Sequence, residues 1–351
     1  MKKSITLILA VVMLVMTGCQ AGGGPAGEPS EPLPTLPSSD QDPEAMELAY
    51  ERSWMAQDSV CWYTANESDE GISGIYAISK ADESERLVYQ AEKASYAISN
   101  MALDIAGDYI YFLMIDQSDE PNEFMFSPFQ VCAIQKDGSN FSVLLTRETM
   151  PVRVDEILMD LRAYDDCLLL KSNSRTLFLY DLRSAESKVV GHIVTMFGFH
   201  GDKLYYVSNW SLLVTDIDLK ETQVLIQATD AWDKRESKNL VGRVLFVGDD
   251  LFYCQRAPYG IYQYLDGERR LIYDGLGIDG EMAVFSYAGK LYFMREEGET
   301  DTLIQYDPQT ESMKELLKLS DYLYVNKIFN GYLYYSDLNN QLRWIQIELP
   351  A

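Results

Sequence analysis

Imidazole and nucleophile chemistry has few candidate residues in this chain. His192 and His200 are the only two histidines. Neither has a Cys or Glu beside it at a metal-ligand spacing, so we interpret both as polar turn residues. The chain also contains no nucleophile elbow of the kind that presents a catalytic serine. We therefore predict no metal site and no cofactor.

Paired carboxylates are the stronger catalytic possibility, because 54 of the 351 residues are Asp or Glu. Two carboxyl groups about 5 to 9 Å apart can act as general acid and as nucleophile or base in glycoside hydrolysis. Five acids fall on or near strands that the pattern below places innermost in the fold: Asp104, Asp155, Glu156, Asp160 and Glu281. Chance placement explains them equally well in so acidic a chain. They remain candidates for an alternative function, a glycoside hydrolase or lyase with carboxylates at a channel mouth.

A second set of residues suits binding. Trp210, Trp232 and Tyr259 fall in predicted loops, and Arg256 lies close to Tyr259 in the sequence. Exposed aromatic side chains with a polar rim can stack on a sugar or anchor a protein. Acidic residues gather in other loops and favour basic partners; they include Asp119, Glu120 and Glu296.

The elements that position these residues are indicated by an internal repeat. A tight turn, an aliphatic residue and two large side chains recur seven times, at intervals between 36 and 58 residues. The clearest copies are Gly107–Phe112, Gly201–Tyr206 and Gly248–Tyr253. A short strand follows each copy, a third strand comes after a polar turn, and an apolar run precedes each copy. Four strands in every 40 to 50 residues predict an all-β fold, a β-propeller.

The number of blades follows from the repeats. We predict seven four-stranded blades, with six as the alternative if the first repeat is degenerate. The seventh repeat ends after its third strand, so its outer strand must come from the N-terminal segment or be missing. Residues Met46 to Tyr50 are the nearest candidate for that strand. We interpret the recurring aromatic pairs as packing between blades.

Loop lengths predict which face binds a ligand. The connections from first to second and from third to fourth strand are short and regular. The other connections lie on the opposite face and are longer; they include 64–73, 113–128, 227–240, 254–259 and 294–301. Binding residues tend to lie on irregular loops of a rigid scaffold. We therefore expect any protein or glycan ligand on this long-loop face.

The repeats resemble the low-density-lipoprotein-receptor-like β-propellers that Gram-positive bacteria carry as surface lipoproteins. The resemblance covers residues 46 to 351 and is carried by the Gly-Asp-x-Leu-Tyr-Tyr copies, Gly74-Ile75-Tyr76, Gly260-Ile261-Tyr262 and Lys136-Asp137-Gly138-Ser139. It implies a propeller and no particular activity, since the role of most such bacterial proteins is unknown. The chain lacks the Tyr-Trp-Thr-Asp tetrapeptide of the receptor pattern, so no receptor ligand is implied.

The N-terminus predicts export and anchoring. Lys2 and Lys3 precede a twelve-residue apolar stretch, which is the layout of a signal peptide over residues 1–18. Met16-Thr17-Gly18-Cys19 resembles the bacterial lipobox, which implies lipidation of Cys19. Residues 19–44 form a Pro- and Gly-rich acidic tether, and residues 45–351 form the single propeller domain.

The charge and the cysteines allow two further predictions. The formal net charge of −25 disfavours nucleic acid as a partner. We expect the four cysteines after Cys19 to be free and buried, because the repeat places them on different blades. The sequence thus predicts a monomeric, extracytoplasmic, membrane-anchored binding or scaffolding module rather than an enzyme.

Overall fold

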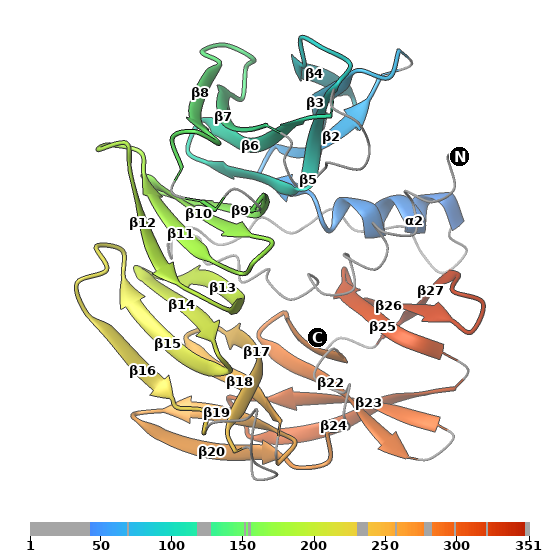
Figure 1. The fold of residues 1–351 in the computed structure, drawn as a ribbon. Coiled ribbons are helices and arrows are strands. Elements are labelled where there is room, and N and C mark those ends of the chain that lie inside the picture. Colours follow the sequence, from blue (N-terminus) through green and yellow to red (C-terminus); the bar gives the residue numbers. More distant parts are fainter. Residues whose placement is uncertain are drawn as a thin grey trace. The chain divides into compact units, whose positions relative to one another are not determined.

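Seven antiparallel sheets follow one another along the chain, and the strands of each sheet lie in chain order (Figure 1). The computed structural model describes residues 43–68, 70–117, 128–150, 152–153, 156–229, 238–256, 258–276, 283–297, 300–320 and 322–347. Six sheets have four strands, and the described part of the last has three. Each sheet is one blade, so the β-propeller prediction is confirmed with seven blades rather than six.

The described residues form two compact units, and unit 2 covers Glu51–Val194. It contains blade 1 with β1 (Ala56–Gln57), β2 (Cys61–Glu67), β3 (Ser73–Ser79) and β4 (Glu85–Gln90); blade 2 with β5 (Tyr96–Ala106), β6 (Tyr109–Asp116), β7 (Phe129–Gln135) and β8 (Ser142–Thr146); and blade 3 with β9 (Leu158–Tyr164), β10 (Cys167–Ser172), β11 (Leu177–Asp181) and β12 (Glu186–Gly191).

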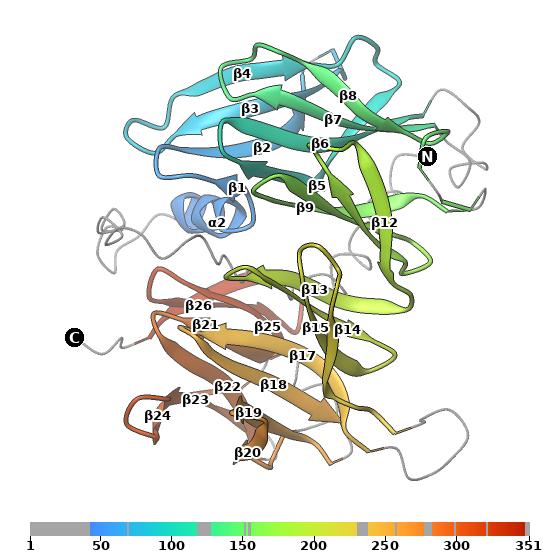
Figure 2. The same ribbon diagram turned by 90° about the vertical axis from the view of Figure 1, so that its left-hand side faces the viewer.

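Unit 1 contains Thr195–Ala351 and the chain up to Tyr50, and Figure 2 shows four of its strands, β17 to β20, in chain order. Its elements are the helix α2 (Pro43–Arg52), whose last two residues belong to unit 2; blade 4 with β13 (Val194–His200), β14 (Lys203–Ser208), β15 (Ser211–Asp216) and β16 (Thr222–Ile226); blade 5 with β17 (Leu240–Val247), β18 (Asp250–Arg256), β19 (Gly260–Leu265) and β20 (Glu268–Tyr273); blade 6 with β21 (Val284–Tyr287), β22 (Lys290–Glu297), β23 (Thr300–Asp307) and β24 (Ser312–Leu319); and blade 7 with β25 (Tyr322–Phe329), β26 (Tyr332–Asp337) and β27 (Leu342–Gln346).

Within each unit, the hydrophobic core lies between neighbouring blades. On β6, Ile110 and Phe112 pack with side chains of blade 1, whereas Tyr111 and Leu113 pack with side chains of blade 3. This alternation follows from the period of two in a strand. All four side chains are buried, and burying an aliphatic or aromatic side chain of this size stabilises a fold by about 1.5 to 3 kcal/mol. The aromatic pairs of the repeat are therefore core residues, as the sequence predicts.

Strand connections leave each sheet at two different ends. Two residues join the first strand to the second in blades 2 to 7, and Gly107, Gly201 and Gly248 begin three of these turns with φ between 55° and 60°. Glycine adopts this left-handed conformation without the steric cost that a Cβ brings. We call this the turn end of a sheet. At the opposite end, which we call the long-loop end, between two and thirteen residues separate successive strands.

The pairing of the fourth, outer strand with the third strand is interrupted by a register shift at a corresponding position in all six four-stranded blades. The register between the third and fourth strands shifts once in every four-stranded blade, as between Ile261 and Tyr262 in blade 5. A β-bulge increases the local twist and makes an edge strand a poor template for pairing with another chain. The blade edges are thus protected by a feature that repeats with the fold.

Helix α2 covers Met46 to Tyr50, the candidate segment for an outer strand of blade 7. Met46 is buried against Tyr332 and Tyr334 of β26, and the Tyr50 ring lies 5.2 Å from the Tyr334 ring. The candidate strand is therefore a helix that packs on β26, and of the two possibilities the described residues show blade 7 with three strands. The helix begins at Pro43, whose fixed φ suits a first helical residue.

Candidate functional site

Two of the predicted catalytic acids lie on adjacent first strands. Asp104 is on β5 and Asp160 is on β9, and these strands pack side by side in unit 2. Asp160 forms ion pairs with Arg162 at 3.3 Å and with Lys171 at 3.5 Å. Asp104 accepts hydrogen bonds from the backbone N–H groups of Ile105 and Ala163, both at 2.9 Å. The structure therefore brings the two acids into one polar cluster between blades 2 and 3.

The electrostatics of this cluster come from burial and from its own charges. Burial raises the pKa of Asp104, and the charge of Asp160 adds to that rise. The Arg162 guanidinium and the two backbone N–H groups oppose it, but the pKa remains above its ordinary value. Each carboxylate is oriented by groups of the protein itself. The arrangement joins two blades through the hydrogen bond from Ala163 N to Asp104.

Glu156 lies at the long-loop end of blade 3 and is buried. Its carboxylate accepts a hydrogen bond from the Ser174 hydroxyl and one from the Arg153 N–H at 3.1 Å. Ser174 in turn contacts the hydroxyl of Thr176 at 3.2 Å, and Thr176 contacts His192 Nδ1 at 3.3 Å. This hydroxyl chain fixes the four-residue connection between β10 and β11. The remaining catalytic candidates, Asp155 and Glu281, lie outside the described residues.

The histidines differ in their surroundings. His192 is an exposed residue in the two-residue connection after β12, as the sequence predicts. His200 ends strand β13, and its ring stacks on Phe246 at 3.9 Å with 4° between the planes. The prediction that His200 lies in the turn is therefore wrong. It is a strand residue whose ring packs on a ring of the next blade, and the repeat pattern does not indicate that contact. Among the described residues, no group of three or more His, Cys, Asp or Glu could hold a metal ion.

Trp210 stands out among the predicted binding residues. Asn209 and Trp210 alone connect β14 to β15, with φ values of 47° and 64°. Two central residues with positive φ define a type I′ turn, whose second position prefers glycine. A bulky residue in this conformation is a backbone outlier that costs on the order of 1–3 kcal/mol. The half-exposed indole is therefore held at the long-loop end of blade 4 by a strained turn.

Arg256 brings a cation to this indole. It is the last residue of β18, and its guanidinium carbon lies 5.0 Å from the centre of the Trp210 ring. The backbone of Trp210 is fixed as well, since its carbonyl accepts a hydrogen bond from Val241 N at 2.8 Å. The structure thus brings together two predicted binding residues from neighbouring blades. Tyr259 lies in the turn before β19 and packs partly buried against the core between blades 5 and 6.

Polar side chains surround this pair of residues. Ser211 follows Trp210 and accepts a hydrogen bond from Gln227 Nε2 at 3.3 Å. Asn239 donates to the Gln227 carbonyl at 3.5 Å and precedes Leu240, the β17 residue that pairs with Arg256. Asn209, Gln227 and Lys238 are exposed. We call Asn209, Trp210, Gln227, Lys238, Asn239 and Arg256 the Trp210 surface.

The acidic loop residues do not form a described site. Glu296 is exposed within strand β22, where it pairs directly with Asp301 of β23. The predicted long loop over 294–301 is therefore wrong, since only two residues separate these strands. Asp119, Glu120 and Trp232 lie outside the described residues.

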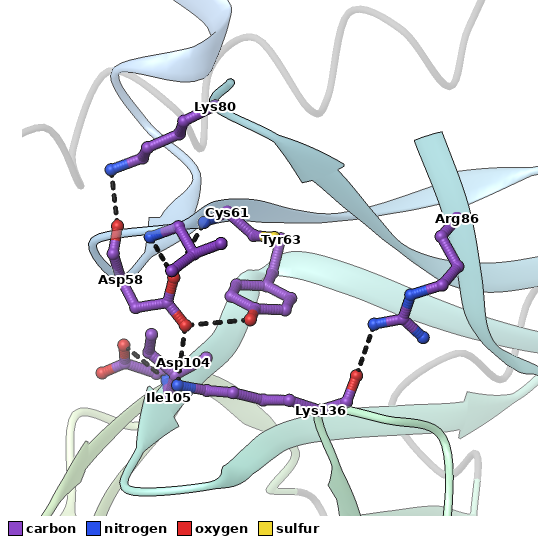
Figure 3. A network of polar contacts seen from close by, with 9 residues as sticks. Asp58, Cys61, Tyr63, Lys80, Arg86, Asp104, Ile105 and Lys136 are labelled. Carbon is purple, nitrogen blue, oxygen red and sulfur yellow. Dashed lines mark hydrogen bonds and ion pairs between the residues drawn. The ribbon is translucent and has the colours of Figure 1, made fainter. Parts of the chain in front are cut away.

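A polar network that the sequence did not indicate joins blades 1 and 2 (Figure 3). The Asp58 carboxylate accepts hydrogen bonds from the N–H groups of Val60 and Cys61, each at 2.8 Å. It also accepts from the Tyr63 hydroxyl at 2.9 Å and from Lys136 Nζ at 2.8 Å. Lys136 belongs to the turn between β7 and β8, so its ammonium group crosses from one blade to the other.

The pKa of Asp58 reflects these four donors. Burial raises it, but the hydrogen bonds from Lys136, from the two backbone N–H groups and from Tyr63 together lower the pKa to about 2. Burial and the same carboxylate raise the pKa of Tyr63. This network lies at the turn end of its blades. It stabilises the contact between blades 1 and 2.

The structure also tests the prediction that the four cysteines after Cys19 are free and buried. Cys132, Cys167 and Cys254 are buried and Cys61 is half-buried, and all four are free, as predicted. Burial raises the pKa values of the Cys132 and Cys167 thiols to about 12, so both remain protonated at neutral pH.

No helix in the described ranges is long and apolar enough to cross a membrane.

Comparison with solved structures supports the fold. Dipeptidyl peptidase 4 of Porphyromonas gingivalis is similar with a TM-score of 0.50 and 11% identity, over 81% of this chain and 50% of that one. The β-propeller domain of the Trilobed protease from Pyrococcus furiosus is similar with a TM-score of 0.48 and 11% identity, over 82% of this chain and 89% of that one. This chain spans half the length of the Porphyromonas enzyme. At these identities the likeness concerns the fold alone.

Sequence comparison adds no family. No family model matches the chain, and no curated protein matches it in sequence. The resemblance to lipoprotein-receptor-like propellers therefore stays a prediction beyond the propeller fold itself.

Proposed function

We propose that this protein is an extracytoplasmic lipoprotein, anchored through Cys19, whose propeller is a binding module with its ligand-binding surface around Trp210. The supporting observation is the conformation of Trp210. A turn of two residues with positive φ is most stable with glycine at the second position. An indole at that position, partly exposed and 5.0 Å from the guanidinium carbon of Arg256, indicates that the side chain serves something other than the stability of the turn.

The surroundings of Trp210 also suit binding. A half-exposed indole offers a large, rigid contact area at low conformational-entropy cost, and aromatic and Arg side chains are enriched among residues that dominate binding energy. Trp210 lies in a two-residue connection at the long-loop end of blade 4, and Arg256 ends strand β18, so rigid strands hold both side chains in place. The alternative, a carbohydrate-active enzyme, rests on carboxylates of which the described ones, Asp104, Glu156 and Asp160, each bond to groups of the protein.

Binding is tested with Trp210→Gly, which removes the indole and suits the left-handed turn. We expect purified residues 20–351, which lack Cys19 and its lipid, to co-sediment with the cell envelope of the chain's own bacterium, and Trp210→Gly in the same form to lose at least tenfold in affinity. Leu219→Gly is the matched control, since Leu219 also has positive φ, at 57°, but lies at the turn end of the same blade. Equal envelope binding by wild type and Trp210→Gly would refute the proposed surface.

Anchoring is supported by the apolar N-terminal stretch, the lipobox-like Met16–Cys19 and the tether that follows. We expect the wild type to enter the detergent phase of a phase-separation assay and to carry a lipid mass on a peptide that begins at Cys19. Cys19→Ser should remain in the aqueous phase or uncleaved, whereas Cys61→Ser should behave as wild type. A Cys19→Ser protein with the same mass shift and partitioning as wild type would exclude lipidation at this residue.

A further inference from the structure

We propose that the outer edge of β27 is a docking site for an extended, cationic segment of a partner protein, which adds a fourth strand to blade 7. This inference goes beyond the proposed function, because it concerns a different blade from the Trp210 surface. It is carried by three features of the described residues: the exposure of β27, the direction of its backbone groups and the charge of the chain.

Strand β27 has the exposure of an outer strand although it holds the third position in its blade. In β7 and β11, the third strands of blades 2 and 3, most side chains are buried and a fourth strand lies beyond each. No side chain of β27 is buried, and Ile345 is 38% exposed. Among the described residues, β27 is the last strand of its sheet (Figure 1). The third strand of blade 7 is therefore a sheet edge in the described part of the chain.

The hydrogen bonds at the two ends of β27 show which of its backbone groups point outward. The Asp337 N–H donates to the Gln341 carbonyl at 3.0 Å, and the Ile347 N–H donates to the Gly331 carbonyl at 2.9 Å. Both contacts share one antiparallel register with β26, in which bonded and non-bonded pairs alternate. The odd-numbered residues of β27 therefore bond to β26, and the even-numbered residues direct their N–H and C=O groups outward. These outward residues are Leu342, Trp344 and Gln346.

The edge of blade 7 is also more regular than the edges of the other blades. In each four-stranded blade a register shift interrupts the pairing of the outer strand. The pairing of β27 with β26 has no such shift. A regular edge is a template on which an extended segment can add a strand, whereas a bulge twists an edge away from a partner. The main chain of the added strand supplies affinity, and its alternate side chains supply specificity.

The charge and the side chains indicate which segment fits this edge. The chain carries a formal charge of −25, so it attracts a cationic segment and repels an acidic one at long range. Arg343 forms an ion pair with Asp337 at 2.9 Å, which neutralises the cation of β27 itself. Trp344 and Ile345 lie on opposite faces of the strand, and β-branched residues pack well beside such side chains. The segment is thus basic, free of proline and rich in β-branched residues.

Two other occupants fit this edge less well. A second copy of the chain would bring together two molecules of formal charge −25. Two five-residue strands by themselves also bury less than the roughly 1,000 Å² of a specific interface. The chain's own segment before α2 is rich in proline, which lacks the N–H that a ladder needs. Its prolines are Pro25, Pro29, Pro32, Pro34 and Pro37.

The experiment follows residue-resolved hydrogen exchange of the full chain in detergent, with and without a heptapeptide that alternates Thr and Val between terminal lysines. Without peptide, we expect the outward amides of Leu342, Trp344 and Gln346 to exchange faster than the inward amides of Arg343 and Ile345. The peptide should slow the outward amides at least tenfold. A counterpart with terminal glutamates should bind at least tenfold more weakly at low ionic strength. A counterpart N-methylated at two adjacent central residues has both edges blocked and should have no effect.

The variants separate the backbone of β27 from its side chains. Gln346→Pro removes one outward N–H and leaves the pairing with β26 intact, so it should weaken peptide binding by about fivefold or more. Gln346→Ala keeps that N–H and should bind the peptide as wild type does. Trp210→Gly should also bind it as wild type does, which separates this site from the proposed function.

Three results would overturn the inference. Slow exchange of the outward amides before peptide is added would mean that the edge is already occupied, and sedimentation would then distinguish a second copy from the chain's own segment. Equal binding of the lysine and glutamate peptides would refute a cationic partner. Unchanged exchange with the lysine peptide, or equal peptide binding by wild type and Gln346→Pro, would show that β27 does not accept a strand.

Discussion

Some contacts between neighbouring blades are made by a single carboxylate. Asp58 makes such a contact through its ion pair with Lys136. Its oxygens accept four hydrogen bonds, one of them from Lys136 on the next blade. Because these donors stabilise the ionised form, the pKa of Asp58 falls from 3.8 to about 2 in the folded state. A carboxyl whose pKa is lowered on folding adds stability above its unfolded pKa, and that stability is lost as pH falls toward the folded value.

The pH dependence of stability should therefore change in Asp58→Asn. The shift corresponds to about 2 kcal/mol at neutral pH. We expect urea unfolding to show a free energy of unfolding lower by about 1–2 kcal/mol at pH 7, with the difference from wild type shrinking between pH 4 and pH 2. Lys136→Met should remove much of the same pH dependence, and the double variant should not add the two effects. Parallel profiles for wild type and Asp58→Asn over that range would contradict this account.

Trp210 and Arg256 could be predicted as binding candidates because both lie at or next to connections between predicted strands, where aromatic and Arg side chains can reach a ligand. Their contact depends on the register of two blades, which the repeat pattern alone does not specify. Asp58 and Lys136 were not selected, since a carboxylate and a lysine 78 residues apart look like ordinary turn residues until the blades pack.

Strands and their connections follow the repeats closely, whereas the helix does not. Alternating apolar residues and Gly-Asp turns predict the strands, since both properties are local. Two described side chains of the segment Met46 to Tyr50, Met46 and Tyr50, pack on blade 7, and their spacing of four fits a helix face. The expected need for an outer strand in blade 7 made this segment a strand candidate.

Docking of α2 should contribute measurably to stability through Met46. This side chain is 1% exposed, so Met46→Ala should lower the free energy of unfolding by about 2–5 kcal/mol. Glu47→Ala, an exposed neighbour on the same helix, should change it by less than about 0.5 kcal/mol. Chemical denaturation of the two variants measures the difference. Equal stabilities would mean that the helix is not bound to blade 7 in solution.

The whole molecule combines a repeated scaffold with a few positions where the repeat is broken. The number of sheets and their strand order could be predicted because each blade repeats one local pattern. The proposed binding surface could be predicted only as a face, since its residues depart from that pattern. Trp210 occupies a turn position that glycine would satisfy better, and this departure carries the proposed function.

The most direct test measures stability and envelope binding together in Trp210→Gly and Leu219→Gly. Relief of left-handed strain is offset by the greater freedom of glycine in the unfolded chain, so both variants should stay within about 1 kcal/mol of wild-type stability. We predict that Trp210→Gly alone loses at least tenfold in envelope binding. A Trp210→Gly protein that is equally stable and binds the envelope as tightly as wild type would contradict the central claim.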